Sequence, residues 1–250
     1  MKNFLNFLKV IIWPIIFLIG QFLILLIFCL INGTNNLSSN ELEQFINKNS
    51  ILITIITFLI FGFLFIKNYK KYSVNYNEKL KFKSILFIII LGSLIVISFN
   101  VIISMVNLLF NFTSYDISKT NILSYVICTG IIGPILEELL FRGIVLNKLK
   151  ENYKTMTSIL ITSFLFAFFH QSFIQILYAF VLSFMLIYVY QKYKNILAPI
   201  LLHITSNIFN LIISYIISKN INIVNLVLLI ISLASLYLIN VNVIQKDLKN

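Results

Sequence analysis

The chain has little charge and little cysteine for its length. Only 11% of its 250 residues are charged and 60% are hydrophobic, which excludes a soluble globular domain of ordinary composition. The two cysteines, Cys29 and Cys128, both lie inside apolar runs, which argues against a disulfide framework. The sequence also contains no repeat and no low-complexity linker. These absences predict an all-α protein, specifically a polytopic helical membrane protein.

Long apolar runs account for most of the sequence. A bilayer core requires about 20 apolar residues per helix. About eight runs approach or exceed that length and predict about eight transmembrane helices: 5–31, 51–67, 84–111, 121–149, 155–171, 173–191, 195–217 and 221–241. The first run lacks a cleavage pattern and is expected to be an anchor. The fifth run is short, and a hairpin of the fifth and sixth runs that does not fully cross is an alternative. The stretch 32–50 is expected to be a polar outer loop.

The net charge of +11 comes mainly from lysines in loops between the apolar runs. Lysines placed in this way indicate topology and not nucleic-acid binding. The N-terminus, the even-numbered loops and the C-terminal tail hold most of them, whereas the alternate loops hold only Lys48, Lys119 and Lys219. The positive-inside rule therefore predicts that both termini are cytoplasmic. The heavy use of lysine, isoleucine and asparagine fits an AT-rich bacterium, so the expected location is a bacterial plasma membrane.

Three charged residues interrupt the fourth apolar run, namely Glu137, Glu138 and Arg142, which is the single arginine. Each costs roughly 2.5–3.5 kcal/mol at the centre of a spanning helix, so the segment must line protein or water. Glu138 and Arg142 are four residues apart and can pair along one helix face. Glu137 is rotated about 100° away and can face a different cavity. A carboxylate in this desolvated position is a stronger base than one in water, as a general base requires.

Other polar residues lie in apolar runs nearby. Gly130, Gly133 and Pro134 are expected to loosen the fourth helix just before the glutamates and to admit water. Both histidines of the chain, His170 and His203, also lie in apolar runs.

Asn207 follows His203 by four residues and can share its helix face. At 1.5 Å per residue, His203 lies roughly 12 Å deep and Asn207 and Glu137 roughly 18 Å deep. His170 lies roughly 22 Å deep, or at mid-membrane if the fifth and sixth runs form a hairpin. The sequence thus predicts that these four side chains meet around one pocket of water. The alternative is purely structural, with ion pairing and interhelical hydrogen bonds.

Three motifs in order complete the pattern. They are Glu137-Glu138-x-x-x-Arg142, Phe166-x-x-x-His170 and His203-x-x-x-Asn207. Over roughly residues 121–210 the chain resembles the CPBP family, the CAAX proteases and bacteriocin-processing enzymes, also called the Abi family. The resemblance implies a CAAX-protease-like helical bundle and an intramembrane endopeptidase, which is a hydrolase.

The resemblance also implies catalytic roles. Glu137 and His170 would activate a water for attack on a peptide carbonyl, while His203 and Asn207 would donate to the oxyanion. A neutral histidine and an asparagine amide are reasonable donors, each worth roughly 3–4 kcal/mol. The substrate would be a peptide or protein at the membrane, and the partners would be that substrate and the lipid bilayer, with no nucleic acid.

The metal requirement stays open at this stage. The family is often described as metalloproteases, and Glu137, His170 and His203 are candidate ligands for zinc or another divalent metal. No His-Glu-x-x-His helix is present, so the spacing alone does not require zinc. Glu138 and Arg142 would support the geometry of the site.

The resemblance divides the chain into three parts. Residues 1–120 would form N-terminal transmembrane helices without a motif, 121–217 the catalytic helical core, and 218–250 a C-terminal transmembrane helix with a basic tail. Relatives in bacteria suggest bacteriocin maturation or self-immunity, and eukaryotic-type relatives suggest CAAX-like processing. The alternatives are a non-catalytic membrane immunity or scaffold protein of the same fold, and an ion-coupled transporter. A transporter would be expected to show broken helices in both halves or internal pseudo-symmetry, and the sequence shows neither.

Overall fold

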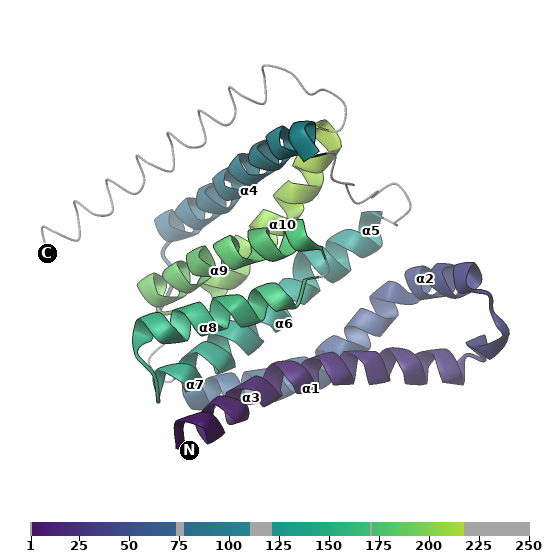
Figure 1. The fold of residues 1–250 in the computed structure, drawn as a ribbon, viewed down its shortest axis with the longest axis horizontal. Helices are drawn as coiled ribbons and strands as arrows, with labels where there is room; N and C mark the ends of the chain where they lie inside the picture. The colour runs from purple at the N-terminus through teal and green to yellow at the C-terminus, as the bar shows by residue number, and fades with distance from the viewer. Residues whose placement is uncertain (1, 74–77, 111–121, 171, 218–250) are drawn as a thin grey trace, which may run out of the picture. The chain divides into compact units, whose positions relative to one another are not determined.

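The computed structural model describes residues 2–73, 78–110, 122–170 and 172–217, and its regular secondary structure there is entirely helical (Figure 1). The prediction of an all-α protein is therefore confirmed. Among the described residues, five helices are long and apolar enough to cross a membrane: Phe7–Ile31, Ser39–Tyr72, Phe82–Ile103, Ile122–Lys150 and Phe173–Tyr193. The run 221–241 lies outside the described residues, so the number of eight stays a prediction.

Helix α1 (Lys2–Ile31) exposes large apolar side chains along much of its length, such as Phe22 and Ile31. A spanning helix that contacts lipid must expose apolar side chains to it. Gly33, with a φ of 67°, turns the chain into a 3-10 turn at Thr34–Asn36. This connection joins α1 to α2 at one end of the pair (Figure 1).

Helix α2 (Ser39–Thr57) begins inside the stretch that was expected to be a polar loop, so that expectation is wrong for residues 39–50. The reason is a capping box, which stabilises the start of a helix whatever the polarity of its first turns. The Ser38 amide donates to the Glu41 carboxylate at 2.8 Å, and the Glu41 amide donates back to Ser38 Oγ at 3.5 Å. The helix continues through a π-helical segment, Phe58–Gly62, into α3 (Phe63–Tyr72).

The chain forms two compact units that alternate along the sequence. The first comprises Met1–Lys79 and Ile117–Ile200, and the second comprises Leu80–Asp116 and Leu201–Asn250. The predicted domain division at residues 120 and 217 stays a prediction.

In the second unit, α4 (Phe82–Phe110) packs against α10 (Leu197–Ile217), which belongs to this unit from Leu201 onward. A Cβ at Gly92 would lie 3.1 Å from the Leu202 carbonyl oxygen, so the missing side chain allows the two backbones to approach. Asn100 Nδ2 also donates to Asn210 Oδ1 at 2.8 Å.

The first unit contains the helix that carries the three charged residues, Ile122–Lys150, here called the motif helix. Its five segments are α5 (Ile122–Tyr125), a π segment (Val126–Ile132), α6 (Gly133–Glu138), a second π segment (Leu139–Leu146) and α7 (Asn147–Lys150). It packs against α1, α3 and α8. A Cβ at Gly143 would lie 3.0 Å from Tyr69 Cδ2, so this glycine brings α3 close to the motif helix.

Helices α8 (Thr155–Phe168) and α9 (Phe173–Tyr193) form a tight hairpin and lie side by side (Figure 1). The 14 residues of α8 rise only about 21 Å, less than the ~30 Å of a hydrocarbon core. This agrees with the prediction that the fifth apolar run is short. Ser172 begins α9 with a second capping box, formed with Gln175.

Buried contacts fix α9 to the motif helix near the end of the hairpin. Leu146, Ile187 and Tyr190 form a fully buried cluster. Asn147 Nδ2 donates both to Tyr190 Oη at 2.9 Å and to the Gly143 carbonyl at 3.0 Å. The motif helix, α8 and α9 thus form one packed group within the first unit.

Candidate active site

The two glutamates lie on a short α-helical stretch between two π-helical segments. The first π segment ends at Ile132, and Gly133 and Pro134 begin α6. Proline cannot donate a backbone hydrogen bond, which is consistent with the irregular turn that precedes it. The expected loosening of the helix before the glutamates is therefore present. Single π turns occur frequently at functional sites, so the location of α6 between two of them makes it a candidate site.

Glu138 and Arg142 form a completely buried ion pair. Arg142 Nη1 lies 2.8 Å from Glu138 Oε1, and both side chains are 0% exposed. The pairing predicted from their spacing is thus present. Removing one partner of a buried pair typically costs 3–5 kcal/mol because an uncompensated charge is left inside.

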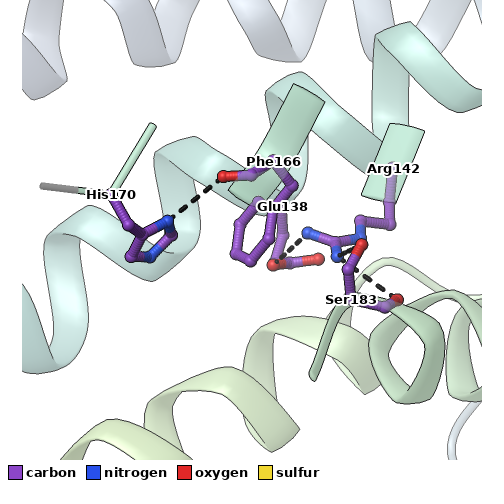
Figure 2. Close-up of polar contacts among 5 residues, drawn as sticks. All are labelled: Glu138, Arg142, Phe166, His170 and Ser183. Atoms are coloured by element: carbon purple, nitrogen blue, oxygen red, sulfur yellow. Dashed lines mark hydrogen bonds and ion pairs between the residues drawn. The ribbon is translucent and has the colours of Figure 1, made fainter. Parts of the chain in front are cut away.

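Arg142 also makes contacts with the α8–α9 hairpin (Figure 2). Its Nη2 donates to Ser183 Oγ on α9 at 2.8 Å and approaches the Ser183 carbonyl oxygen at 3.4 Å. The guanidinium carbon lies 4.4 Å from the centre of the Phe166 ring on α8, a distance at which cation–π attraction is favourable. One charged side chain therefore connects three helical segments. The sequence analysis did not identify Ser183, although a serine in the middle of an apolar helix is a signal that could have found it.

His170 lies immediately after α8, in the turn to α9. Its Nδ1 lies 3.1 Å from the Phe166 carbonyl oxygen, and its ring packs on the edge of the Phe166 ring with centroids 5.2 Å apart (Figure 2). A carbonyl oxygen can only accept, so Nδ1 is the nitrogen that carries the proton. In the neutral imidazole Nε2 is then the basic nitrogen. Phe166 thus contacts both His170 and Arg142.

Glu137 differs from Glu138 in its surroundings. Glu138 is fully buried against Arg142, whereas Glu137 is partly exposed. Glu137 Oε1 lies 3.9 Å from the position that a Cβ at Gly133 would occupy, so the carboxylate is close to a glycine on its own helix. The structure therefore separates the two adjacent carboxylates into one buried partner of Arg142 and one that is accessible.

His203 and Asn207 lie on α10, in the part that belongs to the second unit. His203 is 3% exposed and Asn207 is partly exposed. They are one helical turn apart, as their spacing predicts. The meeting of these two residues with Glu137 and His170 stays a prediction.

Comparison with known protein families gives a match to part of the chain. Residues 119–209 match the family model described as type II CAAX prenyl endopeptidase Rce1-like. The segment is an Rce1-like domain of the CPBP family. Searches among curated proteins and among solved structures found no significant match. The matched segment contains all six candidate site residues: Glu137, Glu138, Arg142, His170, His203 and Asn207.

The Rce1-like domain and the apolar helices together indicate an integral membrane protein. The matched segment covers less than half of the chain. It includes the motif helix from Ile122 onward, the α8–α9 hairpin and the first part of α10.

No set of three His, Cys, Asp or Glu side chains among the described residues is clustered closely enough to hold a metal ion. Whether Glu137, His170 and His203 bind zinc or another divalent metal stays a prediction.

Two of the buried polar side-chain atoms lie on the motif helix and on α8. Arg142 Nε and Ser163 Oγ are inaccessible to solvent and make no hydrogen bond to any described residue. Ser163 lies on α8, three residues before Phe166, and is 0% exposed. Ser158 and Thr162 are also fully buried on α8, and their hydroxyls donate to the backbone one turn earlier. The interior of the Rce1-like domain is thus polar along α8, which a helix packed only against lipid cannot be.

Proposed function

We propose that the protein is an intramembrane endopeptidase that hydrolyses a peptide bond near the membrane, with Glu137 and His170 activating the water. The observation that carries the proposal is the different environment of the two adjacent glutamates. Glu138 is bound to Arg142 in the interior, and Glu137 is partly exposed. An Rce1-like domain supplies the class of reaction.

In the proposed first step, Glu137 accepts a proton from a water molecule while the oxygen of that water attacks the peptide carbonyl. A carboxylate is suited to this role, since it can accept a proton from a water within hydrogen-bond reach. His170 assists through Nε2, the nitrogen left basic when Nδ1 donates to the Phe166 carbonyl. The hydrogen bond to Phe166 holds the imidazole ring in a fixed orientation.

The carbonyl oxygen becomes an oxyanion in the tetrahedral intermediate. His203 and Asn207 are proposed to donate hydrogen bonds to it, each contributing roughly 3–4 kcal/mol. Collapse of the intermediate breaks the carbon–nitrogen bond, and the proton held by Glu137 passes to the leaving amine. The base of the first half of the reaction thus acts as the acid of the second half.

The buried contacts of Arg142 are proposed to hold this arrangement in place. Arg142 joins Glu138 on the motif helix, Ser183 on α9 and Phe166 on α8. Because Phe166 also contacts His170, displacement of Arg142 would move the histidine as well. Arg142 and Glu138 are therefore assigned a positioning role.

The proposed substrate is a peptide or protein at the membrane surface. The family description favours CAAX-like processing near a prenylated cysteine. Processing of a bacteriocin precursor, in maturation or self-immunity, is the second substrate class that the resemblance supports. Zinc or another divalent metal would act at the same residues if the enzyme requires one.

The proposal is tested by purifying the full chain in detergent and incubating it with peptides ending in Cys-aliphatic-aliphatic-X, with and without a prenyl group. Products are identified by mass spectrometry, and bound metal is measured in the same sample. We expect cleavage by the wild type and by Phe168→Ala, which changes an exposed side chain near the site. We expect no cleavage by His170→Ala, although it inserts normally.

Two results would count against the proposal. A His170→Ala protein that cleaves as the wild type does would remove the histidine from the mechanism. A wild type that cleaves no peptide but conducts protons in vesicles, with conduction lost in Glu137→Gln, would establish ion transport instead.

A further inference from the structure

A group of lysines and aromatic rings lies away from the candidate active site, on the same unit. We call it the Trp13 cluster, and its members are Lys9, Trp13, Lys71, Tyr72 and Lys148. Lys148 Nζ lies 5.4 Å from the centre of the Trp13 ring and 5.1 Å from that of the Tyr72 ring. Lys148 Nζ also donates to the Lys9 carbonyl oxygen at 3.5 Å, and Lys71 Nζ lies 5.4 Å from the Tyr72 ring.

The Trp13 cluster is assembled from the ends of three candidate membrane spans. Tyr72 is the last residue of the span Ser39–Tyr72, and Lys148 lies two residues before the end of Ile122–Lys150. Lys9 and Trp13 lie within the first two turns of Phe7–Ile31. Ends of membrane spans lie at the boundary between hydrocarbon and water, where tryptophan, tyrosine and lysine are enriched. We therefore expect the cluster to lie at the depth of lipid headgroups.

The cluster carries three positive charges and no carboxylate. In the described part of the chain, the ion pairs are Glu138 with Arg142 and Glu78 with Lys194, and neither involves Lys9, Lys71 or Lys148. Lys9 and Lys71 are exposed, while Lys148 is half-buried against the two rings. An ammonium group has three donors, and a carbonyl 3.5 Å away occupies one of those of Lys148. The chemistry of the cluster thus suits an anion from outside the chain.

Apolar surface continues from the cluster along α1. Leu8 and Ile12 are 45% and 51% exposed, on the same turns as Lys9 and Trp13. A ligand that fits both features has a negative headgroup and a hydrocarbon tail. A soluble anion would bind the lysines and make no use of the apolar residues. A protein partner would be expected to bury the exposed apolar residues, but it would not require a position at the depth of the lipid headgroups.

We propose that the Trp13 cluster binds the phosphate headgroup of an anionic phospholipid. Lys148 contacts the phosphate from between α1 and α3, with Lys9 and Lys71 adding charge at the rim. The rings of Trp13 and Tyr72 orient the Lys148 side chain toward the headgroup region, and the acyl chain lies along α1. Basic pockets between membrane helices recognise anionic headgroups in this manner.

Trp13 is the only tryptophan of the chain, so its fluorescence reports on this cluster alone. The full protein is reconstituted in phosphatidylcholine vesicles that contain either brominated phosphatidylglycerol or brominated phosphatidylcholine at equal mole fraction. Bromine quenches tryptophan on contact, so the ratio of the two quenching efficiencies measures headgroup preference. We expect stronger quenching by the anionic lipid.

Charge variants separate a binding site from general surface attraction. Lys148→Gln is expected to weaken the preference about fivefold, in line with the attraction of one lysine near a charged surface. Lys71→Gln, at an exposed position, should also weaken the preference for the anionic lipid. Lys148→Arg should retain that preference. The matched control is Lys192→Gln, because Lys192 also lies over a tyrosine ring, Tyr188, but on α9. That control should leave the preference unchanged.

Three outcomes would overturn the proposal. Equal quenching by the two brominated lipids would mean that the lysines act only as topology signals. Loss of the preference on adding inorganic phosphate at millimolar concentration would assign the cluster to a soluble anion. A decrease in Lys192→Gln as large as that in Lys148→Gln and Lys71→Gln would assign the preference to net charge and not to this cluster.

Discussion

Arg142 is the residue whose buried contacts join the motif helix to the α8–α9 hairpin. Its guanidinium is fully buried and contacts Glu138, Ser183 and the Phe166 ring, which belong to three different helical segments. A charge in a membrane interior is tolerated only when it is paired and hydrogen-bonded. The stability of this packed group therefore depends on each of these contacts.

The hydroxyl of Ser183 should contribute measurably to stability. Ser183→Ala removes the acceptor of a 2.8 Å hydrogen bond from Arg142 and leaves Nη2 only the more distant Ser183 carbonyl oxygen, at 3.4 Å. Hydrogen bonds to charged groups contribute about 1.5–3 kcal/mol, so we expect a loss of stability of that size. The measurement is the unfolding of the purified protein in detergent with increasing denaturant.

Ser163→Ala is the matched control for this experiment. Ser163 is equally buried, on the neighbouring helix α8, but its hydroxyl makes no hydrogen bond to a described residue. Its removal should change stability by less than about 0.5 kcal/mol, since no partner loses a bond. A larger loss in Ser163→Ala than in Ser183→Ala would contradict the role assigned to the Arg142–Ser183 contact.

Residue spacing predicted part of this arrangement. Glu138 and Arg142 are neighbours on one helix, so their four-residue separation was sufficient to predict the pair. The Arg142–Ser183 bond joins residues 41 positions apart, and only the packing of α9 against the motif helix creates it. Local periodicity carries no information on such a contact.

At the scale of elements, the motif helix was only partly predictable. Gly133 and Pro134 indicated the irregular turn before α6, and a π segment ends there. The second π segment, Leu139–Leu146, has no proline and a single glycine, Gly143, which packs against Tyr69. The second π segment thus coincides with a contact to another helix. The sequence around it contains no pattern that predicts a π segment.

The start of α2, unlike the second π segment, did have a signal in the sequence. The polarity of residues 32–50 favoured a loop, but the spacing of Ser38 and Glu41 contained a capping signal that a hydropathy criterion does not use. Polarity indicates exposure to water and not the absence of a helix. The span Ser39–Tyr72 is consequently longer than the apolar run 51–67 from which it was predicted.

The close contact of α4 with α10 gives a prediction for a helix pair. Gly92→Ala would place a methyl group 3.1 Å from the Leu202 carbonyl, and backbone atoms cannot rotate away. We expect a loss of stability of about 1–2 kcal/mol from overpacking, measured by thermal unfolding in detergent.

Gly62→Ala provides the comparison, because its nearest neighbour atoms would lie at 3.7 Å, an ordinary contact distance. This substitution should stabilise the helix by up to about 1 kcal/mol through helix propensity. Equal effects of the two substitutions would mean that the approach of α4 to α10 does not depend on Gly92.

For the whole molecule, the distribution of lysines predicts the orientation in the membrane. Reporter fusions can test it at two described turns, Asn32–Leu37 after α1 and Glu151–Tyr153 before α8. The positive-inside rule predicts an external reporter at the first and a cytoplasmic reporter at the second. Both reporters on one side, or the opposite orientation, would show that the lysines do not set the topology.

The two adjacent glutamates are assigned different tasks, which the amide variants of the two residues can distinguish. Cleavage rate and unfolding free energy are measured for purified Glu137→Gln and Glu138→Gln. We predict that Glu137→Gln unfolds as the wild type does but cleaves at least about 100-fold more slowly, as expected for loss of a general base. Glu138→Gln should lose about 3–5 kcal/mol of stability, because the Arg142 charge is left buried without its partner. Cleavage at the wild-type rate by Glu137→Gln would contradict the account.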